Sequence, residues 1–293
     1  MTLEQLRFFR AVIDGGSFRA AAERVHRTQP AITHQIKALE RELGHVLIDR
    51  KTAAPTPAGR LLYTRGSALI SDADAMRAAM QDFDETQAGE LRLGTSDTTA
   101  LYTLPPIVRR FRRANPGTRL HIVNRPTEVI AQMVQLGDLD IGIVTLPVSS
   151  AQLMERVLFE QELVLVVPRR HRMATRTIVR ARDLQSEPLL LLEDVTRTGK
   201  LLREFFRMSG FTPNIVLDTS SFEVIKRYVA EGIGISFLPR AAVRPRDTTL
   251  HVVRVPGLPR VTIGAIWRTG AYQTRAALNL LELFDTPRKT RRR

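Results

Sequence analysis

The sequence predicts an α/β protein built from a small helical N-terminal part, one long helix, and a larger part in which strands and helices alternate. Two observations carry this prediction. Residues 1–44 hold segments whose apolar residues recur at helical spacing. From Gly89 onward, apolar runs of strand length alternate with amphipathic segments, which is the pattern of βαβ units and of a parallel sheet.

Composition indicates a globular protein with an acidic partner. The 293 residues are enough for two or three domains, and 43% of them are hydrophobic. The net charge of +14 favours nucleic acid as the partner first and a membrane surface second. The chain has no cysteine, which excludes disulfides, thiolate metal sites and cysteine redox sensing.

The sequence gives no sign of export, membrane insertion or metal binding. The chain starts directly with an amphipathic, charged segment rather than with a signal peptide. Apolar runs such as LVLVV and PLLLL are of strand length, far shorter than a membrane span. The six histidines are scattered without ligand spacing. We therefore expect a cytoplasmic protein with no metal, no cofactor and no membrane contact.

Local signals place three helices in the first 44 residues. The segment TLEQLRFFRAVIDGG opens with a capping box formed by Thr2 and Gln5 and ends at its two glycines. Ser17 is the expected N-cap of the segment SFRAAAERV. Thr28 is the expected N-cap of the segment TQPAITHQIKALERELG, which ends at Gly44.

The second and third of these helices form a predicted helix-turn-helix. In the third helix Ile32, Ile36, Leu39 and Leu43 share one apolar face, and the turn before it is short. In this motif the second helix enters the major groove. Residues 1–60 hold ten Lys and Arg against six Asp and Glu, a mild excess. An ordinary three-helix packing unit remains an alternative. The candidate DNA contacts on the third helix are Gln29, Pro30, Ala31, Thr33, His34 and Lys37.

A wing and a long helix are expected next. HVLID and APT are predicted to pair as a short two-stranded wing, with Arg50 and Lys51 near its tip as further candidate DNA contacts. Thr56 is the expected cap of a helix that runs to about Glu85. Apolar residues at heptad spacing indicate dimerisation through this helix, although packing along its own domain remains an alternative. The heptad residues are Leu62, Leu69, Met76 and Phe83, with Gly66, Ala73 and Met80 between them.

The N-terminal motifs resemble those of a known family. The stretch SFRAAAERVHRTQPAITHQIKALERELGHVLIDR, followed by TPAG, is similar to the N-terminal domain of LysR-type transcriptional regulators. The wing is about two residues shorter than is usual there, and His34 stands where an arginine or another long polar residue is common. The resemblance covers nearly the whole chain, since the part after Gly89 also follows the family's layout.

The resemblance implies a domain organisation. Residues 1–58 correspond to a winged helix-turn-helix DNA-binding domain, 59–88 to a linker and dimerisation helix, and 89–293 to an effector-binding regulatory domain. The regulatory domain is expected to have two lobes, as in periplasmic binding proteins. Lobe 1 spans about 89–160 and 263–285, and lobe 2 spans about 161–262. The implied partners are double-stranded promoter DNA, a small effector, and further copies of the chain in a dimer and a tetramer.

A ligand is expected in the cleft between the lobes. The loop TSDTT after the first strand opens onto a helix, and a helix N-terminus favours an anion. The implied effector is therefore a small anionic or polar metabolite, and Arg125 and Arg197 are candidates to supply positive charge. By motif position, the effector-binding residues implied by the resemblance are Ser96, Thr98, Thr99, Thr127, Thr145 and Thr198.

Enzymes and solute-binding proteins are the alternatives. The sequence has no G-x-S-x-G, P-loop, H-E-x-x-H or G-x-G-x-x-G motif in a suitable context. Asp138 and Asp140 look like a carboxylate pair, but they fall at a helix-to-strand turn, so catalysis there is disfavoured. A solute-binding protein disagrees with the N-terminal helix-turn-helix. The expectation is a transcriptional regulator and not an enzyme.

Overall fold

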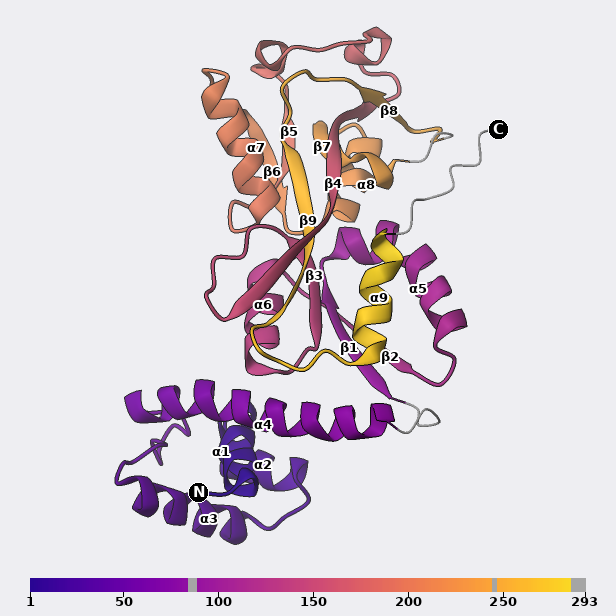
Figure 1. The fold of residues 1–293 in the computed structure, drawn as a ribbon. Helices are drawn as coiled ribbons and strands as arrows, with labels where there is room; N and C mark the ends of the chain where they lie inside the picture. The colour runs from indigo at the N-terminus through magenta and orange to yellow at the C-terminus, as the bar shows by residue number, and fades with distance from the viewer. Residues whose placement is uncertain (84–88, 244–246, 286–293) are drawn as a thin grey trace. The chain divides into compact units, whose positions relative to one another are not determined.

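The computed structural model describes residues 1–83, 89–243 and 247–285 (Figure 1). Its contacts divide the chain into two compact units. The first unit contains residues 1–89 together with 135–138 and 270–274, and the second contains the rest.

The first unit contains the helices that the caps predicted. They are α1 (Leu3–Gly15), α2 (Phe18–Arg24), α3 (Gln29–Leu43) and α4 (Pro57–Phe83). Thr2 and Gln5 form the capping box of α1, and the Ser17 and Thr28 hydroxyls accept hydrogen bonds from the first turns of α2 and α3. Gly44 ends α3 at a φ of 72°, a left-handed conformation that glycine adopts without steric cost.

The apolar stripe of α3 is the centre of the N-terminal core. Ile32, Ile36 and Leu39 are fully buried and pack with Phe9 of α1. Ala21 of α2 is also fully buried. Its small side chain allows the helices to approach closely where they cross. The predicted packing of the helix-turn-helix is therefore present.

The wing is shorter than the predicted pair of strands. A single antiparallel bridge joins Ile48 to Pro55, and two backbone hydrogen bonds flank it, from the Asp49 amide to the Ala54 carbonyl at 2.9 Å and from the Thr56 amide to the Leu47 carbonyl at 3.0 Å. The Asp49 carboxylate accepts hydrogen bonds from the Lys51 and Thr52 amides, which closes the turn at once. These bonds hold the pKa of Asp49 below its usual value. The local turn thus replaces a longer ladder.

Helix α4 is divided between a packed face and an open face. Leu62 packs on the N-terminal core, and a side chain at Gly66 would come within 3.1 Å of Leu6. The first residue of the predicted heptad, Leu62, therefore packs within its own unit, whereas Leu69 and Met76 are exposed. The side chain of Phe83 lies outside the described residues. Exposed apolar side chains form a stripe along the other face of α4: Leu61, Leu69, Met76 and Met80.

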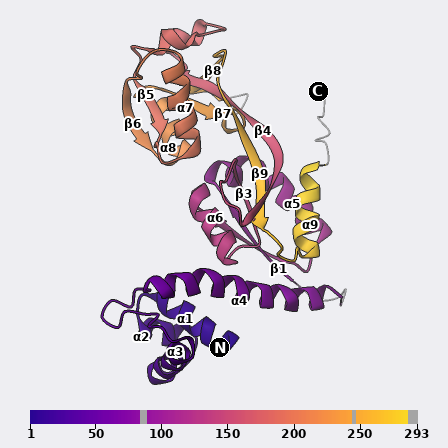
Figure 2. The ribbon, with the colours of Figure 1, turned by 60° about the vertical axis from the view of Figure 1, so that its left-hand side comes forward.

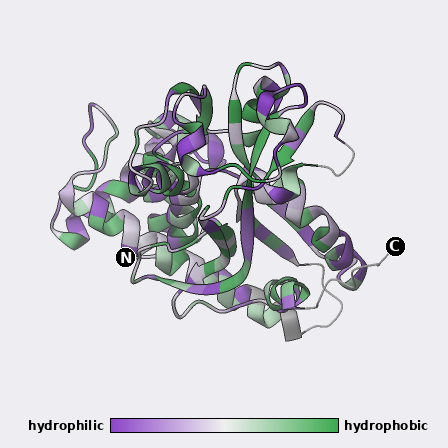
Figure 3. Cartoon of the chain, turned by 90° about the horizontal axis from the view of Figure 1, so that it is seen from above, coloured by the Kyte–Doolittle hydropathy of each residue, from purple (hydrophilic) through white to green (hydrophobic). Residues whose placement is uncertain are grey.

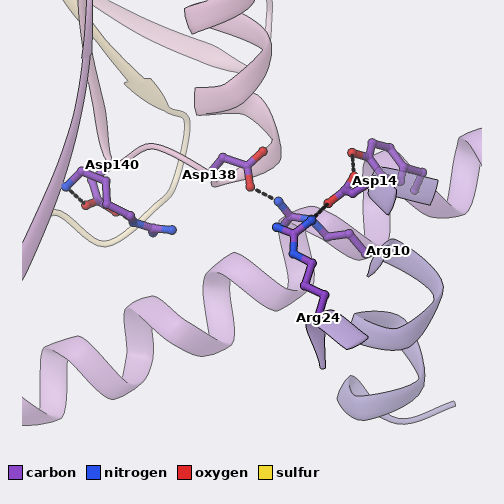
Figure 4. Close-up of polar contacts among 7 residues, drawn as sticks. Arg10, Asp14, Arg24, Asp138 and Asp140 are labelled. Carbon is purple, nitrogen blue, oxygen red and sulfur yellow. Dashed lines mark hydrogen bonds and ion pairs between the residues drawn. The ribbon is translucent and has the colours of Figure 1, made fainter. Parts of the chain in front are cut away.

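A polar cluster ties α1, α2 and α4 together. The Tyr63 hydroxyl donates a hydrogen bond of 2.6 Å to the Asp14 carboxylate, and Arg10 and Arg24 form ion pairs with Asp14. Burial, and then the hydrogen bond to Asp14, raises the pKa of Tyr63 to about 12. Arg10 also pairs with Asp138, whose turn groups with the first unit (Figure 4).

The two carboxylates of the GDLDIG segment have separate structural partners. Asp138 pairs with Arg10 (Figure 4). Asp140 accepts hydrogen bonds from the Arg92 amide at 2.7 Å and from its guanidinium at 2.9 Å. They do not form a catalytic pair, because each is already neutralised by an arginine.

The second unit is a mixed sheet covered by helices on both faces. Its strands are β1 (Glu90–Thr95), β2 (Arg119–Asn124), β3 (Ile141–Thr145), β4 (Leu153–Pro168), β5 (Leu189–Leu192), β6 (Ile215–Thr219), β7 (Ile235–Pro239), β8 (Leu250–Val253) and β9 (Arg260–Arg268). Its helices are α5 (Leu104–Ala114), α6 (Thr127–Leu136), α7 (Arg197–Met208), α8 (Phe222–Ala230) and α9 (Arg275–Asp285). Short π- or 3-10-helical segments are η1 (Thr99–Thr103), η2 (Arg172–Thr175), η3 (Ala181–Leu184) and η4 (Arg240–Ala242).

The strand order is β2-β1-β3-β9-β4-β7-β5-β6, with β8 paired to β4. The predicted parallel pairs are present: β1 pairs with β2 and β3, and β5 with β6 and β7. The βαβ units account for the parallel pairs only; at the centre of the sheet β9 runs antiparallel to β3 and β4. The reason is that β4 and β9 carry the chain between the lobes in opposite directions, as Figure 2 shows.

The expected lobe boundary at about residue 160 lies inside β4, which continues for 16 residues from lobe 1 into lobe 2. Its pairing with β9 shifts between Val157 and Phe159, so the strand bends there but does not end. One buried cluster follows β4 and β9 through both lobes and includes Leu91, Leu165 and Phe206. In Figure 3 the hydrophobic colouring follows the strands, while the helices alternate between hydrophobic and hydrophilic residues.

Gly59 fixes the approach of α4 to the wing. A Cβ atom at this position would lie 2.0 Å from the Leu47 carbonyl oxygen. We expect Gly59→Ala to lower the free energy of unfolding of the N-terminal part by about 1–3 kcal/mol, since backbone atoms must move apart. Hydrogen exchange of the α1–α3 amides measures this. Gly89→Ala is the control, since its Cβ would meet nothing within 4 Å. Equal exchange in the two variants would contradict the prediction.

Candidate functional site

A cavity of about 320 Å³ lies in the second unit, at the carboxyl ends of its parallel strands. From lobe 1 it is lined by residues at or just after the ends of β1, β2 and β3, and from lobe 2 by residues at or just after the ends of β5 and β6. Gln161 of β4 and Ile263 of β9 line it where these strands pass between the lobes. The cavity is therefore the cleft that the alternating strands and helices predicted.

The structure brings most of the predicted effector-binding residues together. The residues that line the cavity are Ser96, Thr98, Thr127, Thr145 and Thr198. Thr99 does not line it: this residue is 1% exposed, and its hydroxyl is hydrogen bonded to Ser96 at 3.3 Å. The cause is the tight turn after β1, where the chain enters the π-helical segment η1 and directs Thr99 into the protein.

Hydroxyl groups are the main polar feature of the cavity. Thr98, Thr127, Thr145 and Thr198 are each 8% exposed. Within residues 1–83, 89–243 and 247–285, none of these four hydroxyls has a hydrogen-bond partner. These hydroxyls are open to the cavity, so they can donate hydrogen bonds to, and accept them from, a molecule inside it. Four such groups around one cavity are suited to a polar ligand.

Two helix N-termini also meet the cavity. Helix α6 begins at Thr127, and α7 begins at Arg197 after its N-cap Thr196. The Thr196 hydroxyl accepts a hydrogen bond of 3.0 Å from the Gly199 amide. A Cβ atom at Gly199 would lie 2.0 Å from the Glu193 carbonyl oxygen, so this tight start of α7 requires glycine. The positive ends of the two helix dipoles favour an anion between them.

Charged side chains of both signs surround the cavity. Arg125 and Arg197 line it as expected, and Asp97 and Glu128 line it as well. Asp97 is hydrogen bonded to Asn124, and Arg197 Nε lies 3.5 Å from the Glu128 carboxylate. The side-chain charges therefore balance, and the helix ends supply the remaining positive potential.

Several lining residues were not predicted from the sequence. Gln161 lies in the middle of β4, between Glu160 and Glu162, and nothing in this polar stretch indicated a binding role. Leu192, Phe222 and Ile263 give the cavity an apolar wall. Glu128 follows Thr127 directly, so its position in the first turn of α6 was the one signal that pointed to it.

The predicted DNA contacts lie mostly on the open side of α3. Gln29, Pro30, Ala31, His34 and Lys37 are exposed, and Thr33 is half-buried. The Thr33 hydroxyl donates a hydrogen bond of 2.9 Å to the Gln29 carbonyl oxygen, within the first turn. This surface is free to enter a groove, since the apolar stripe of α3 faces the core.

The two wing residues differ. Lys51 is exposed at the turn. Arg50 forms an ion pair with Glu40 of α3, and its guanidinium lies 5.1 Å from the centre of the Phe18 ring. The prediction treated the two as equivalent DNA contacts, but Arg50 is held against the helix-turn-helix and Lys51 is not.

Residues 1–83, 89–243 and 247–285 contain no group of three or more His, Cys, Asp or Glu side chains that could hold a metal ion. They also contain no helix that is long and apolar enough to cross a membrane.

Comparison with known proteins identifies the two parts of the chain. Residues 3–60 match the family "Bacterial regulatory helix-turn-helix protein, lysR family", and residues 84–286 match the family "LysR substrate binding domain". The DNA-binding transcriptional dual regulator OxyR of Escherichia coli (strain K12) is 30% identical over 280 residues, which are 92% of this chain and 90% of that protein.

Solved structures agree with the fold. A full-length OxyR variant from Pseudomonas aeruginosa superimposes with a TM-score of 0.81 at 26% identity, over 98% of this chain and 95% of that one. Full-length CbnR complexed with its target DNA has a TM-score of 0.68 at 23% identity, over 97% and 99% of the two chains. The family matches cover both the helix-turn-helix and the two-lobe part, and the chain belongs to the LysR family of DNA-binding transcriptional regulators with an effector-binding domain.

Proposed function

We propose that this regulator controls its promoters in response to a small anionic or polar metabolite bound in the cavity between lobes 1 and 2. The observation that carries the proposal is the set of four threonine residues whose hydroxyls line the cavity without a hydrogen bond to a described residue, beside the N-termini of α6 and α7. Hydroxyls and helix N-terminal amides bind an anion without requiring a full counter-charge. We assign Ser96, Thr98, Thr127, Thr145 and Thr198 to this site.

We further propose that residues 1–58 read DNA, 59–88 link and pair the subunits, and 89–293 bind the effector. The exposed first turns of α3 support the first assignment, and Gln29 is the residue best suited to read a base, since its amide pairs with adenine in two places. Promoter DNA as the target supports a cytoplasmic location.

The proposed switch is a change in the relative position of the two lobes. Ligand groups that bridge residues from both lobes favour one arrangement, and the ligand shifts the equilibrium only by its differential affinity for the two arrangements. We propose that paired subunits, in a tetramer formed by two dimers, convert this change into a different spacing of the DNA-binding domains. The affinities for effector and DNA are then coupled reciprocally.

Thiol oxidation is not the proposed signal. A relative from Escherichia coli, 30% identical to this chain over 280 residues, is named "Hydrogen peroxide-inducible genes activator". The present chain contains no cysteine, so peroxide cannot act on it through a sulfenic acid or a disulfide. The hydroxyl-lined cavity supports reversible binding of a metabolite as the signal.

The hydroxyl of Thr98 is expected to bind the effector. Thr98→Val keeps the shape of the side chain and removes the hydroxyl, which leaves a ligand group unpaired and costs about 1–3 kcal/mol of binding. We expect calorimetry to show this loss for the effector, and footprinting without effector to show unchanged DNA binding. Equal effector affinities of Thr98→Val and the wild type would contradict the site. Thr103→Val, at a buried threonine outside the cavity lining, is the control.

Gln29 is expected to read a base. Gln29→Ala should weaken binding to the specific promoter site by about 1–3 kcal/mol, because a bidentate pair to one base is lost. Binding to random DNA should change little. A gel shift against the DNA upstream of the protein's own gene, with a scrambled competitor, measures both affinities. An unchanged specific affinity would refute the assignment.

The exposed stripe of α4 is expected to pair two subunits. Replacing Leu69 and Met76 together by Asp would bury unpaired charge at the interface, which is costly. Light scattering should show a smaller assembly. Arg77→Asp, which changes the net charge by the same two units at an exposed residue of α4 outside the stripe, is the control. Native mass in the Leu69 and Met76 variant would exclude α4 as the interface.

A further inference from the structure

Glu128 and Arg197 connect the two lobes across the cavity. Glu128 lies in the first turn of α6 in lobe 1, and Arg197 is the first residue of α7 in lobe 2. Both line the cavity, and Arg197 Nε lies 3.5 Å from Glu128 Oε1. The side chain of Arg197 is 25% exposed and that of Glu128 is 52% exposed. The arginine of the pair is therefore mostly buried at the cavity, and the carboxylate is largely exposed to solvent.

The pair is incomplete as a hydrogen-bonded contact. Arg197 Nε is buried and has no hydrogen-bond partner within the described ranges, although the Glu128 carboxylate is close enough to attract its charge. Glu128 likewise has no hydrogen bond to a described residue. An arginine normally binds a carboxylate through two parallel hydrogen bonds. The guanidinium is thus attracted by Glu128 and still has a donor to offer.

We propose that Glu128 is an internal competitor for Arg197, and that the effector is a small organic carboxylate that displaces it. The proposal rests on the cavity being the effector site. In the ligand-free protein the Glu128 carboxylate neutralises Arg197. The ligand carboxylate then takes over Arg197 Nε and receives further hydrogen bonds from the threonine hydroxyls, while Glu128 turns to solvent, where its charge is hydrated.

The surroundings select a carboxylate over a phosphate. Asp97 and Glu128 balance Arg125 and Arg197 around the cavity, so a ligand with two negative charges would lack compensation. One negative charge is matched by the helix N-termini of α6 and α7. Leu192, Phe222 and Ile263 give an apolar wall for the carbon skeleton of an organic acid, which inorganic phosphate would leave empty.

Replacement of the competitor has a consequence for the lobes. The ion pair of Glu128 with Arg197 spans them directly, whereas a bound carboxylate would span them through its own contacts to Arg197 and to lobe 1 hydroxyls such as Thr98 and Thr145. Ligand binding thus replaces the ion pair between the lobes by contacts through the ligand. Glu128 lowers the affinity for the ligand and fixes the spacing of the lobes in the ligand-free protein.

The test uses the full-length chain and three probes: benzoate, benzyl alcohol as its neutral counterpart, and inorganic phosphate. Affinities are measured by calorimetry. Glu128→Gln keeps the shape of the side chain and removes the competing charge, so we expect it to bind benzoate about threefold to tenfold more tightly than wild type. Benzyl alcohol should bind both proteins equally, and phosphate should bind neither. Glu223→Gln, in the exposed first turn of α8 outside the cavity lining, is the matched control and should behave like wild type.

The variant Arg197→Gln tests whether Glu128 and the ligand carboxylate compete for Arg197. In this background the change Glu128→Gln should leave benzoate affinity unaltered, because the arginine for which both carboxylates compete is absent. An equal gain in both backgrounds would mean that Glu128 acts only by general repulsion, and would overturn the proposal.

The remaining outcomes are also decisive. If Glu128→Gln binds benzoate no more tightly than wild type, Glu128 does not compete for Arg197. If Thr98→Val still binds benzoate more weakly than wild type in that case, the cavity remains the effector site. Benzoate that binds neither wild type nor Glu128→Gln at millimolar concentration, or phosphate that binds more tightly than benzoate, would refute the carboxylate class. Benzoate that binds wild type and Thr98→Val equally would refute the site itself.

Discussion

The antiparallel ladder between β4 and β9 is the constraint on which the second unit depends. These two strands are paired from Leu153 to Glu162 and are the continuous backbone that both lobes share. Each lobe adds its parallel strands to one end of this ladder, so the carboxyl ends of β1 and β3 and those of β5 and β6 face a common cavity. Gln161 and Ile263 lie on the ladder itself, where the chain passes between the lobes, and both line the cavity. A ligand in the cavity would therefore contact the ladder as well as the two walls.

The N-terminal part was predictable because its signals are local. Thr2, Ser17, Thr28 and Gly44 each act on their own helix end, and the structure places each as a cap. The wing was not predictable in length, because the Asp49 carboxylate closes the turn through two backbone amides. A β-propensity pattern does not contain such a contact.

The second unit was predictable in its elements but not in its centre. The alternation of apolar runs with amphipathic segments predicts the strands and helices. The continuity of β4 and the antiparallel pairing of β9, in contrast, depend on partners far away in the sequence. The hydroxyl residues of the cavity could be found by motif position. Gln161 and the link between Glu128 and Arg197 could not, since they arise only when two lobes meet.

The net positive charge of the chain favoured a nucleic-acid partner, but most of this charge lies outside the N-terminal part. Residues 1–89 hold 12 Lys and Arg against 11 Asp and Glu, a net charge of +1, so nearly all of the +14 lies beyond them. The DNA-binding part therefore depends on where its basic side chains are placed, and not on a strong overall positive field.

The capture of Arg50 by Glu40 has a consequence for how the wing contacts DNA. The narrow minor groove of A-tracts has an enhanced negative potential that attracts inserted arginine side chains. Here the arginine of the wing is folded back onto α3 and the Phe18 ring, and Lys51 is the basic side chain left at the turn. For this arginine to enter a narrow minor groove it would have to leave the Glu40 carboxylate and the Phe18 ring, so contact between the wing and the minor groove competes with packing inside the DNA-binding domain.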